Sequence, residues 1–372
     1  MGFHSLTIAA KHPFMSSDQN NNGIKDTAPK DTTQGHWVYK TPRSWQPFLQ
    51  LSRLDRPIGY WLLALPGWIG LAFASLSHGL DVTDLKWAAL ILMGAVAMRG
   101  AGCTYNDIVD QDLDAQVDRT ALRPLPAGTI TTKQAWIWLC VQCSIGLIVL
   151  LCLPRLAQII SLCSLPLVAA YPFMKRITWW PQVWLGMTFN WAVLVAYAAK
   201  TGSVTTPLFI LYAGLIFWTI GYDTIYACQD IEDDAFVGIK STARRFGSRV
   251  KLGVGVCYGV CLALIIWAVM NEAMFEYFPT LEESLEKIKD HQSGWVIYPP
   301  SDISGRTERA LLFPKYLSLI FLIPTAIHFI WQLWRFNPSK SMKSLNIFKS
   351  NLWLGLLTAL SIFIYATLLN GI

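Results

Sequence analysis

Nine long apolar segments constrain the fold of this 372-residue chain more than any other feature of its sequence. They lie at about 58–77, 86–105, 134–153, 156–173, 180–199, 207–227, 252–270, 313–334 and 351–370. A helix needs about 20 largely apolar residues to cross the roughly 30 Å hydrocarbon core of a bilayer. Runs such as LIVLLCL lack the period-two alternation of a membrane β-barrel. With 53% hydrophobic and 15% charged residues, the chain is predicted to be an all-α integral membrane protein with nine transmembrane helices.

The basic residues give the orientation of these helices. Twenty-one Lys and Arg lie in the N-terminal segment and in the loops on its side of the membrane, against eight on the opposite side. This asymmetry follows the positive-inside rule and places the N-terminus toward the cytosol or an equivalent compartment. It also supports the count of nine, because a missed span would mix the two sets.

The polar segments divide the chain into two parts. Residues 1–50 are predicted to be a disordered tail, and residues 51–372 a single membrane domain whose longest loop, 271–312, joins the seventh and eighth helices. The tail carries several Asp residues and no Arg before Arg43, whereas a mitochondrial transit peptide is rich in Arg and poor in acids. We therefore expect an endoplasmic-reticulum-type membrane, with the mitochondrial inner membrane as the alternative.

Two acidic clusters stand at the ends of predicted helices. Each contains the pattern D-x-x-x-D, formed by Asp110 and Asp114 in the first cluster and by Asp230 and Asp234 in the second. Carboxylates four residues apart on a helix lie on one face and repel each other. A bound cation would relieve that repulsion, and a few carboxylates together with substrate phosphates are the usual ligands of Mg²⁺.

Both clusters fall on the N-terminal side of the membrane, so they can face each other across one cavity mouth. Basic residues follow each of them, Arg119 and Arg123 after the first and Lys240 after the second, and Lys175 lies in another loop on this side. Acids for a metal and bases for phosphate describe a diphosphate-binding site. The alternative is that the acids are solvated loop charges and the bases set the topology, which leaves the repeated D-x-x-x-D unexplained.

Arg99 and Asp223 lie deeper, inside predicted spans. An ionisable group at that depth costs about 2.5–3.5 kcal/mol or more and commonly marks a substrate site. The two residues could instead pair with each other or reach the interface. In the functional interpretation they line a cavity below the metal, where Arg99 holds a substrate carboxylate.

A diphosphate at the mouth of an apolar cavity favours a prenyl diphosphate as the substrate. Mg²⁺ and the bases would neutralise the departing diphosphate, and aromatic faces would stabilise the allylic cation that remains. The fifth and sixth spans supply Trp180, Trp184, Trp191, Trp218 and Tyr222, which packing of the bundle would equally explain. The expected acceptor is an electron-rich aromatic ring that attacks through carbon.

These motifs resemble those of a known family. GAGCTYNDIVDQDLDAQVDRTALRPLPAG, YPFMKRITWWPQVWLGMTFNW and YDTIYACQDIEDDAFVGIKSTARRFG are similar to the UbiA superfamily of membrane prenyltransferases, and most of all to eukaryotic 4-hydroxybenzoate polyprenyltransferases. The resemblance covers about residues 50–250 and implies nine helices around a central cavity that opens laterally to lipid.

The resemblance also implies roles for individual residues. The metal positions match Asn106, Asp110, Asp114, Asp230 and Asp234, and the diphosphate-binding positions match Arg53, Arg119, Arg123, Lys175 and Lys240. The candidate catalytic residues are Asp223, Arg99 and Tyr226, and the candidate acceptor-binding residues are Arg99 and Asn190.

Three positions depart from the pattern of the ubiquinone enzymes, namely Val109, Gln111 and Cys228. They favour transfer of a farnesyl group to a polyketide-derived, orsellinate-like phenolic acid in fungal meroterpenoid biosynthesis, with 4-hydroxybenzoate prenylation for ubiquinone as the alternative. A transporter is a further alternative, but the acids gather at one membrane face instead of the midplane. The last alternative is a family member that uses a non-aromatic acceptor or cyclises its substrate.

Overall fold

The computed structural model describes residues 36–116, 120–229, 231, 238, 240–272, 301–338 and 341–371. Every regular element in these ranges is a helix. The long helices are α2 (Ile58–His78), α3 (Thr83–Val109), α5 (Thr132–Leu151), α6 (Arg155–Cys163), α7 (Leu165–Ile177), α8 (Pro181–Thr201), α9 (Thr206–Ala227), α12 (Val250–Glu272), α14 (Ser301–Arg335) and α16 (Asn351–Gly371). The short ones are η1 (Trp37–Lys40), α1 (Gln46–Leu51), α4 (Gln111–Asp114), α11 (Thr242–Phe246), η2 (Gly247–Arg249) and α15 (Ser341–Lys349).

The all-α membrane fold is confirmed, but the count of nine spans is not. Eight helical stretches within the described ranges are long and apolar enough to cross a bilayer, with α6 and α7 together making one of them. Of the nine predicted spans, the one not among these eight is α8, which has 21 residues but carries the polar side chains of Gln182, Asn190 and Lys200. Those polar groups find partners inside the protein: Gln182 accepts from Thr242 N of α11, Asn190 donates to Thr219 of α9, and Lys200 donates to Asp84 of α3.

Two predicted polar segments contain helix. Residues 36–50 of the predicted tail include η1 and all of α1 except its last residue, Leu51, while residues 1–35 lie outside the described part of the chain. The predicted loop 271–312 overlaps the ends of α12 and α14, since α12 continues to Glu272 and α14 begins at Ser301. Residues 273–300 of that loop lie outside the described ranges.

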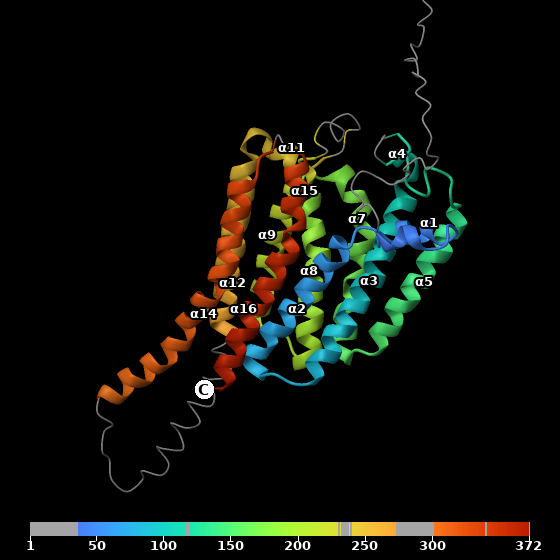
Figure 1. The fold of residues 1–372 in the computed structure, drawn as a ribbon. Coiled ribbons are helices and arrows are strands. Elements are labelled where there is room, and N and C mark those ends of the chain that lie inside the picture. The colour runs from blue at the N-terminus through green and yellow to red at the C-terminus, as the bar shows by residue number, and fades with distance from the viewer. Residues whose placement is uncertain are drawn as a thin grey trace, which may run out of the picture.

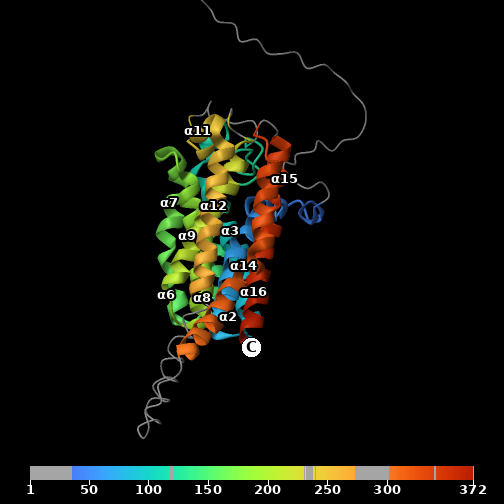
Figure 2. The same ribbon diagram turned by 90° about the vertical axis from the view of Figure 1, so that its left-hand side faces the viewer.

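The long helices run side by side and alternate in direction, as Figures 1 and 2 show. The short helices α4, α11 and α15 lie at one end of the bundle, and the C-terminus lies at the other. Helix α1 runs across the bundle axis (Figure 1). The chain therefore brings the segments after α3, after α7 and after α9 to the same end, as the distribution of Lys and Arg predicted.

The centre of the bundle consists of α2, α8, α9, α12 and α16 packed through small residues. A Cβ on Gly70 of α2 would lie 2.6 Å from the backbone oxygen of Val193 on α8, and one on Gly221 of α9 would overlap the Tyr258 ring of α12. Such close approach of backbones is typical of membrane helix pairs. By contrast, α5 exposes Ile145, Ile148 and Leu151, as a lipid-facing helix would.

Candidate active site

A cavity of about 900 Å³ lies inside the bundle, and its wall is polar in one part and apolar in the rest. The polar and aromatic lining residues include Arg53, Asp55, Arg56, Arg99, Asn106, Asp107, Arg123, Tyr171, Tyr222, Asp223, Tyr226 and Lys349. The apolar lining includes Trp87, Leu90, Ile91, Met98, Leu147, Leu153, Leu165 and Phe189. An apolar cavity with a few convergent polar groups is the usual form of a small-molecule site.

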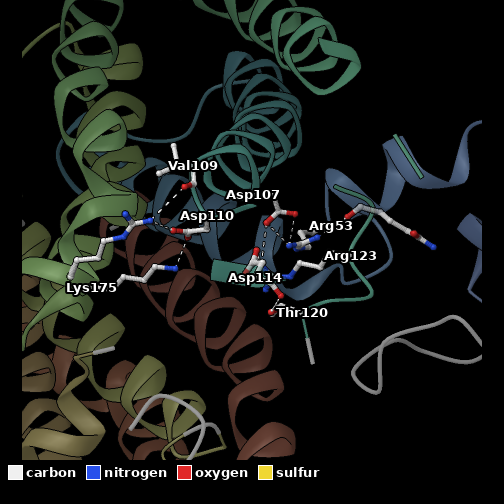
Figure 3. Close-up of polar contacts among 10 residues, drawn as sticks. Arg53, Asp107, Val109, Asp110, Asp114, Thr120, Arg123 and Lys175 are labelled. Atoms are coloured by element: carbon white, nitrogen blue, oxygen red, sulfur yellow. Dashed lines mark hydrogen bonds and ion pairs between the residues drawn. The ribbon is translucent and has the colours of Figure 1, made fainter. Parts of the chain in front are cut away.

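Asp107, in the last turns of α3, is the best-connected acid in this wall. Its carboxylate accepts from Arg53 Nη2 at 2.7 and 2.8 Å and lies 3.3 Å from Arg123 Nη1 (Figure 3). Its side chain is almost fully buried. Burial is the largest single influence and would lower the pKa of Arg53, but its acidic neighbours, Asp107 first and Asp55 among them, together outweigh burial and raise that pKa. The Arg53 guanidinium therefore stays charged beside the end of α3.

Asp110 ends α3, is fully buried, and pairs with the basic residues of α7. Lys175 Nζ donates to its Oδ2 at 2.5 Å, and Arg176 Nη2 donates to its Oδ1 at 2.7 Å (Figure 3). Lys240 lies at the end of α7, where its Nζ donates to the backbone oxygen of Ile177 at 3.2 Å. Lys175 thus lies beside the first acidic motif, whereas the contact of Lys240 is with the end of α7, and neither lysine is among the residues that line the cavity.

Asp114 lies on α4 and binds Arg123, whose Nη1 donates to Asp114 Oδ2 at 2.5 Å. Thr120 Oγ1 donates to the Asp114 backbone oxygen at 2.8 Å, which closes the turn after α4. Burial raises the pKa of the Asp114 carboxyl, and Arg123 partly opposes that shift. In the structure both carboxylates of the first D-x-x-x-D are thus engaged by bases.

The structure describes part of the second acidic region, at the end of α9. Asp223 and Tyr226, both on α9, line the cavity that also contains Asn106 and Asp107 of α3. The predicted ligands Asp230 and Asp234, and the predicted phosphate-binding Arg119, lie outside the described residues. One cavity wall therefore brings together residues from both halves of the chain.

Arg99 enters the cavity from the middle of α3. Its guanidinium carbon lies 5.2 Å from the centroid of the Phe189 ring, and its Nε has no hydrogen-bond partner among the described residues. A Cβ on Gly59 would lie 2.6 Å from that Nε, so a glycine in α2 makes room for the guanidinium. This position fits the predicted contact with a substrate anion.

Asn190 occupies a different environment from the one predicted. It is buried and absent from the cavity lining, and its Nδ2 lies within hydrogen-bonding distance of Gly186 O (2.8 Å), Leu215 O (3.0 Å) and Thr219 Oγ1 (2.8 Å). These bonds join α8 to α9. The geometry gives the predicted acceptor contact no support, because the amide is already engaged between two helices.

The predicted aromatic residues separate into two groups. Trp191 and Tyr222 line the cavity, whereas Trp180, Trp184 and Trp218 do not. Trp184 Nε1 donates to the backbone oxygen of Leu167 at 2.7 Å, and Trp218 Nε1 to Asn351 Oδ1 at 2.8 Å, so these two rings join helices.

Several residues of the candidate site were not predicted from the sequence. Asp107 stood inside the first acidic motif but outside its i, i+4 pair, and Arg176 follows Lys175 directly. Phe348 and Lys349 belong to α15, far from either motif in sequence. No local pattern marks them, because only the packing of α15 against α9 brings them to the cavity.

The oxygen donors at the polar end match the chemistry of a hard divalent cation. Asn106, Asp107 and Asp223 face the same cavity. In the described part of the chain, however, no three His, Cys, Asp or Glu residues already converge as a metal-binding group. The basic partners of Asp107, Asp110 and Asp114 would have to move for those carboxylates to bind a metal.

The sequence is similar to a set of curated enzymes. It is 48% identical over 217 residues to the mitochondrial 4-hydroxybenzoate polyprenyltransferase of Homo sapiens, covering 58% of this chain and 57% of that one. It is 46% identical over 212 residues to the corresponding Arabidopsis thaliana protein, covering 57% and 52%. It is 43% identical over 246 residues to 4-hydroxybenzoate geranyltransferase 1 of Lithospermum erythrorhizon, covering 65% and 78%. The chain thus spans just over half the length of the first two relatives.

Solved structures share the fold. A UbiA homolog from Aeropyrum pernix K1 aligns with a TM-score of 0.54 at 22% identity, covering 82% of this chain and 98% of that one. A UbiA homolog from Archaeoglobus fulgidus, bound to GPP and Mg²⁺, aligns with a TM-score of 0.57 at 16% identity, covering 88% and 100%. The model of the UbiA prenyltransferase family matches residues 63–281. The chain therefore belongs to the UbiA prenyltransferase family.

Proposed function

We propose that this chain transfers a prenyl group from a prenyl diphosphate to a ring carbon of a phenolic acid, in a reaction that depends on Mg²⁺. The main support is the single cavity, in which Asp107 of α3 and Asp223 of α9 share a wall with a long apolar surface. Such a site suits a substrate with a charged head and a hydrocarbon tail. Membership of the UbiA prenyltransferase family agrees with this chemistry.

The apolar part of the cavity would hold the prenyl tail. Its lining on α3 extends from Trp87 to Asp107, which is about 30 Å of helix at 1.5 Å per residue. That length matches the hydrocarbon thickness of a bilayer. We therefore propose farnesyl diphosphate or a longer prenyl diphosphate as the donor.

The polar end would hold the diphosphate. Arg53, Arg123 and Lys175 are now paired with Asp107, Asp114 and Asp110, and each has donors that can bind phosphate oxygens. When bound, Mg²⁺ would neutralise charge on the departing diphosphate. The proposed metal-binding residues are Asn106, Asp110, Asp114, Asp230 and Asp234, and Arg119 and Lys240 are proposed to assist with phosphate.

The transfer itself would occur where the polar and apolar walls meet. The bond from the allylic carbon to the diphosphate oxygen breaks, a carbon–carbon bond to the ring forms, and the ring loses a proton. Tyr222, Tyr226 and Asp223 on α9 line this region and could stabilise the allylic cation. Arg99 would bind the carboxylate of the acceptor from the opposite wall.

The named relatives change the preferred acceptor and membrane. They are called 4-hydroxybenzoate polyprenyltransferases, several of them mitochondrial, so we propose 4-hydroxybenzoate and the mitochondrial inner membrane ahead of the meroterpenoid role and the endoplasmic reticulum. Val109, Gln111 and Cys228 keep an orsellinate-like acid as the second candidate acceptor.

The test uses the full chain purified in detergent. It is incubated with Mg²⁺, farnesyl or longer prenyl diphosphates, and either 4-hydroxybenzoate or orsellinate, and the products are identified by mass spectrometry. A ring-prenylated acid formed together with released diphosphate supports the proposal, and the better acceptor identifies the pathway. Diphosphate release without any prenylated phenolic acid, or no turnover at all, would contradict it.

A further inference from the structure

The short helix α15 brings a cation to the cavity from the C-terminal part of the chain. This helix, Ser341–Lys349, lies between α14 and α16 at the same end of the bundle as α4 and α11, and packs against α9 (Figure 1). It is outside residues 63–281, which the family model matches. Four residues within this helix or shortly after it line the cavity, namely Leu345, Phe348, Lys349 and Leu352.

Phe348 shows which part of the cavity this helix reaches. Its ring centroid lies 4.6 Å from that of Tyr226 and 5.8 Å from that of Tyr222, both on α9. Asp223 lies between these two tyrosines in sequence and lines the same cavity. The end of α15 is therefore part of the wall beside the proposed reaction region.

Lys349 differs from the other basic residues near the first acidic motif. Arg53, Arg123 and Lys175 each pair with a carboxylate, whereas the ammonium of Lys349 has no ion pair or hydrogen bond among the described residues. A role in membrane topology would explain a lysine in this loop. It would not explain why that lysine lines the cavity.

The backbone at Lys349 is held by a buried polar network that follows it directly. Asn351 Nδ2 donates to Phe348 O at 3.1 Å, and Asn351 Oδ1 accepts from Trp218 Nε1 at 2.8 Å. Ser350 Oγ accepts from Gln332 Nε2 at 3.0 Å. Because Asn351 and Gln332 are fully buried, α9, α14 and α16 together fix the position from which the Lys349 side chain extends.

We propose that Lys349 is an anion-binding residue of this site, and that it binds oxygens of a substrate held in the cavity. The anion is either the diphosphate of the prenyl donor or the carboxylate of the acceptor, since an ammonium group binds both. This inference rests on the proposed function, because that function supplies both anions.

The test compares three variants with the wild type: Lys349→Gln, Lys349→Arg and Lys343→Gln. Lys343 is the control, because both lysines are exposed and belong to the same helix, but Lys343 does not line the cavity. The measurements are KM for each substrate, and the calorimetric affinities for inorganic diphosphate with Mg²⁺ and for 4-hydroxybenzoate. Melting temperatures in detergent show whether each variant is folded.

Because Lys349→Gln removes a charge-assisted contact, it should weaken the binding of one of the two anions by about tenfold or more. Lys349→Arg should stay within a few-fold of the wild type, and Lys343→Gln should not differ from it. If only the affinity for diphosphate changes, Lys349 binds the prenyl donor. If only the affinity for 4-hydroxybenzoate changes, Lys349 binds the acceptor. Unchanged affinity for both anions in folded Lys349→Gln overturns the inference, even if turnover falls. If the wild type has no prenyltransferase activity, the proposed function fails, while the calorimetric affinities still decide the role of Lys349.

Discussion

Arg53 donates through Nη2 to both carboxylate oxygens of Asp107, at 2.7 and 2.8 Å, across 54 residues of sequence (Figure 3). The pair joins the segment before α2 to the end of α3. Arg53 is also the non-glycine residue with a positive φ in the described chain, at 55°. Its backbone is therefore held in an unfavourable conformation at the place where its side chain reaches the cavity.

The backbone of Arg53 gives a stability prediction. Arg53→Ala and Arg53→Gly both remove the bond to Asp107, but only glycine adopts a positive φ without steric cost. We expect Arg53→Gly to be more stable than Arg53→Ala by about 1 kcal/mol. Thermal unfolding of the purified variants measures the difference, and an equal or lower stability of the glycine variant would show that the backbone is not strained.

The first acidic motif gives a prediction with an internal control. Asp110→Asn and Asp114→Asn should each reduce kcat by at least about a hundredfold, since both are proposed to bind the metal–diphosphate complex. Asp112→Asn should retain activity, because Asp112 lies between them but is exposed. Steady-state assays with melting temperatures separate loss of function from unfolding. Similar losses in all three variants would argue for a general charge effect.

Removal of metal gives a third prediction. Treatment with EDTA should abolish prenyl transfer, and excess Mg²⁺ should restore it, because the diphosphate leaves poorly without charge neutralisation. The relevant assay is release of diphosphate at fixed donor and acceptor. Full activity after exhaustive chelation would remove the metal from the proposed function.

The opposite end of the bundle gives a prediction on folding. Glu272 is fully buried and accepts from Ser77 Oγ at 3.0 Å, Tyr197 OH at 2.5 Å and Thr205 Oγ1 at 2.9 Å, which joins α12 to α2, α8 and the start of α9. Glu272→Ala leaves these buried hydroxyls without that acceptor and should destabilise the protein by about 3 kcal/mol. Asn271→Ala is the control, since among the described residues the bond of that amide is to Trp267 O of its own helix. Equal melting temperatures for the two variants would contradict a structural role for Glu272.

Hydropathy predicted most of the fold because lipid-spanning helices must be long and apolar. It placed α2, α3, α5, α9 and α12 to within a few residues. It did not predict η1 or α1, because each is too short to give a helical hydropathy pattern. Tertiary contacts hold α1, such as that of the Phe48 ring with the Trp138 ring, whose centroids lie 5.5 Å apart. It also could not separate α6 from α7, because the break at Ser164 falls inside a continuous apolar run.

The site was predictable where its residues repeat in sequence and not where packing assembles it. The acidic motifs and the buried charge of Arg99 were visible as patterns, and Arg99, Asn106 and Asp223 line the cavity. Asn190 gave a polar signal within a helix, but its partners on α9 became apparent only in three dimensions. Lys349 gave no signal of its own, because its position depends on how α15 packs against α9.

The central claim is that the two halves of the chain bind one diphosphate in one cavity. A structure determined with Mg²⁺ and a non-reactive prenyl thiodiphosphate tests it most directly. We expect a single diphosphate group at the polar end, contacted by the end of α3 and by the Asp230 segment, with its tail along the apolar lining of α3. A diphosphate bound elsewhere, or contacted by only one of the two acidic motifs, would contradict the account.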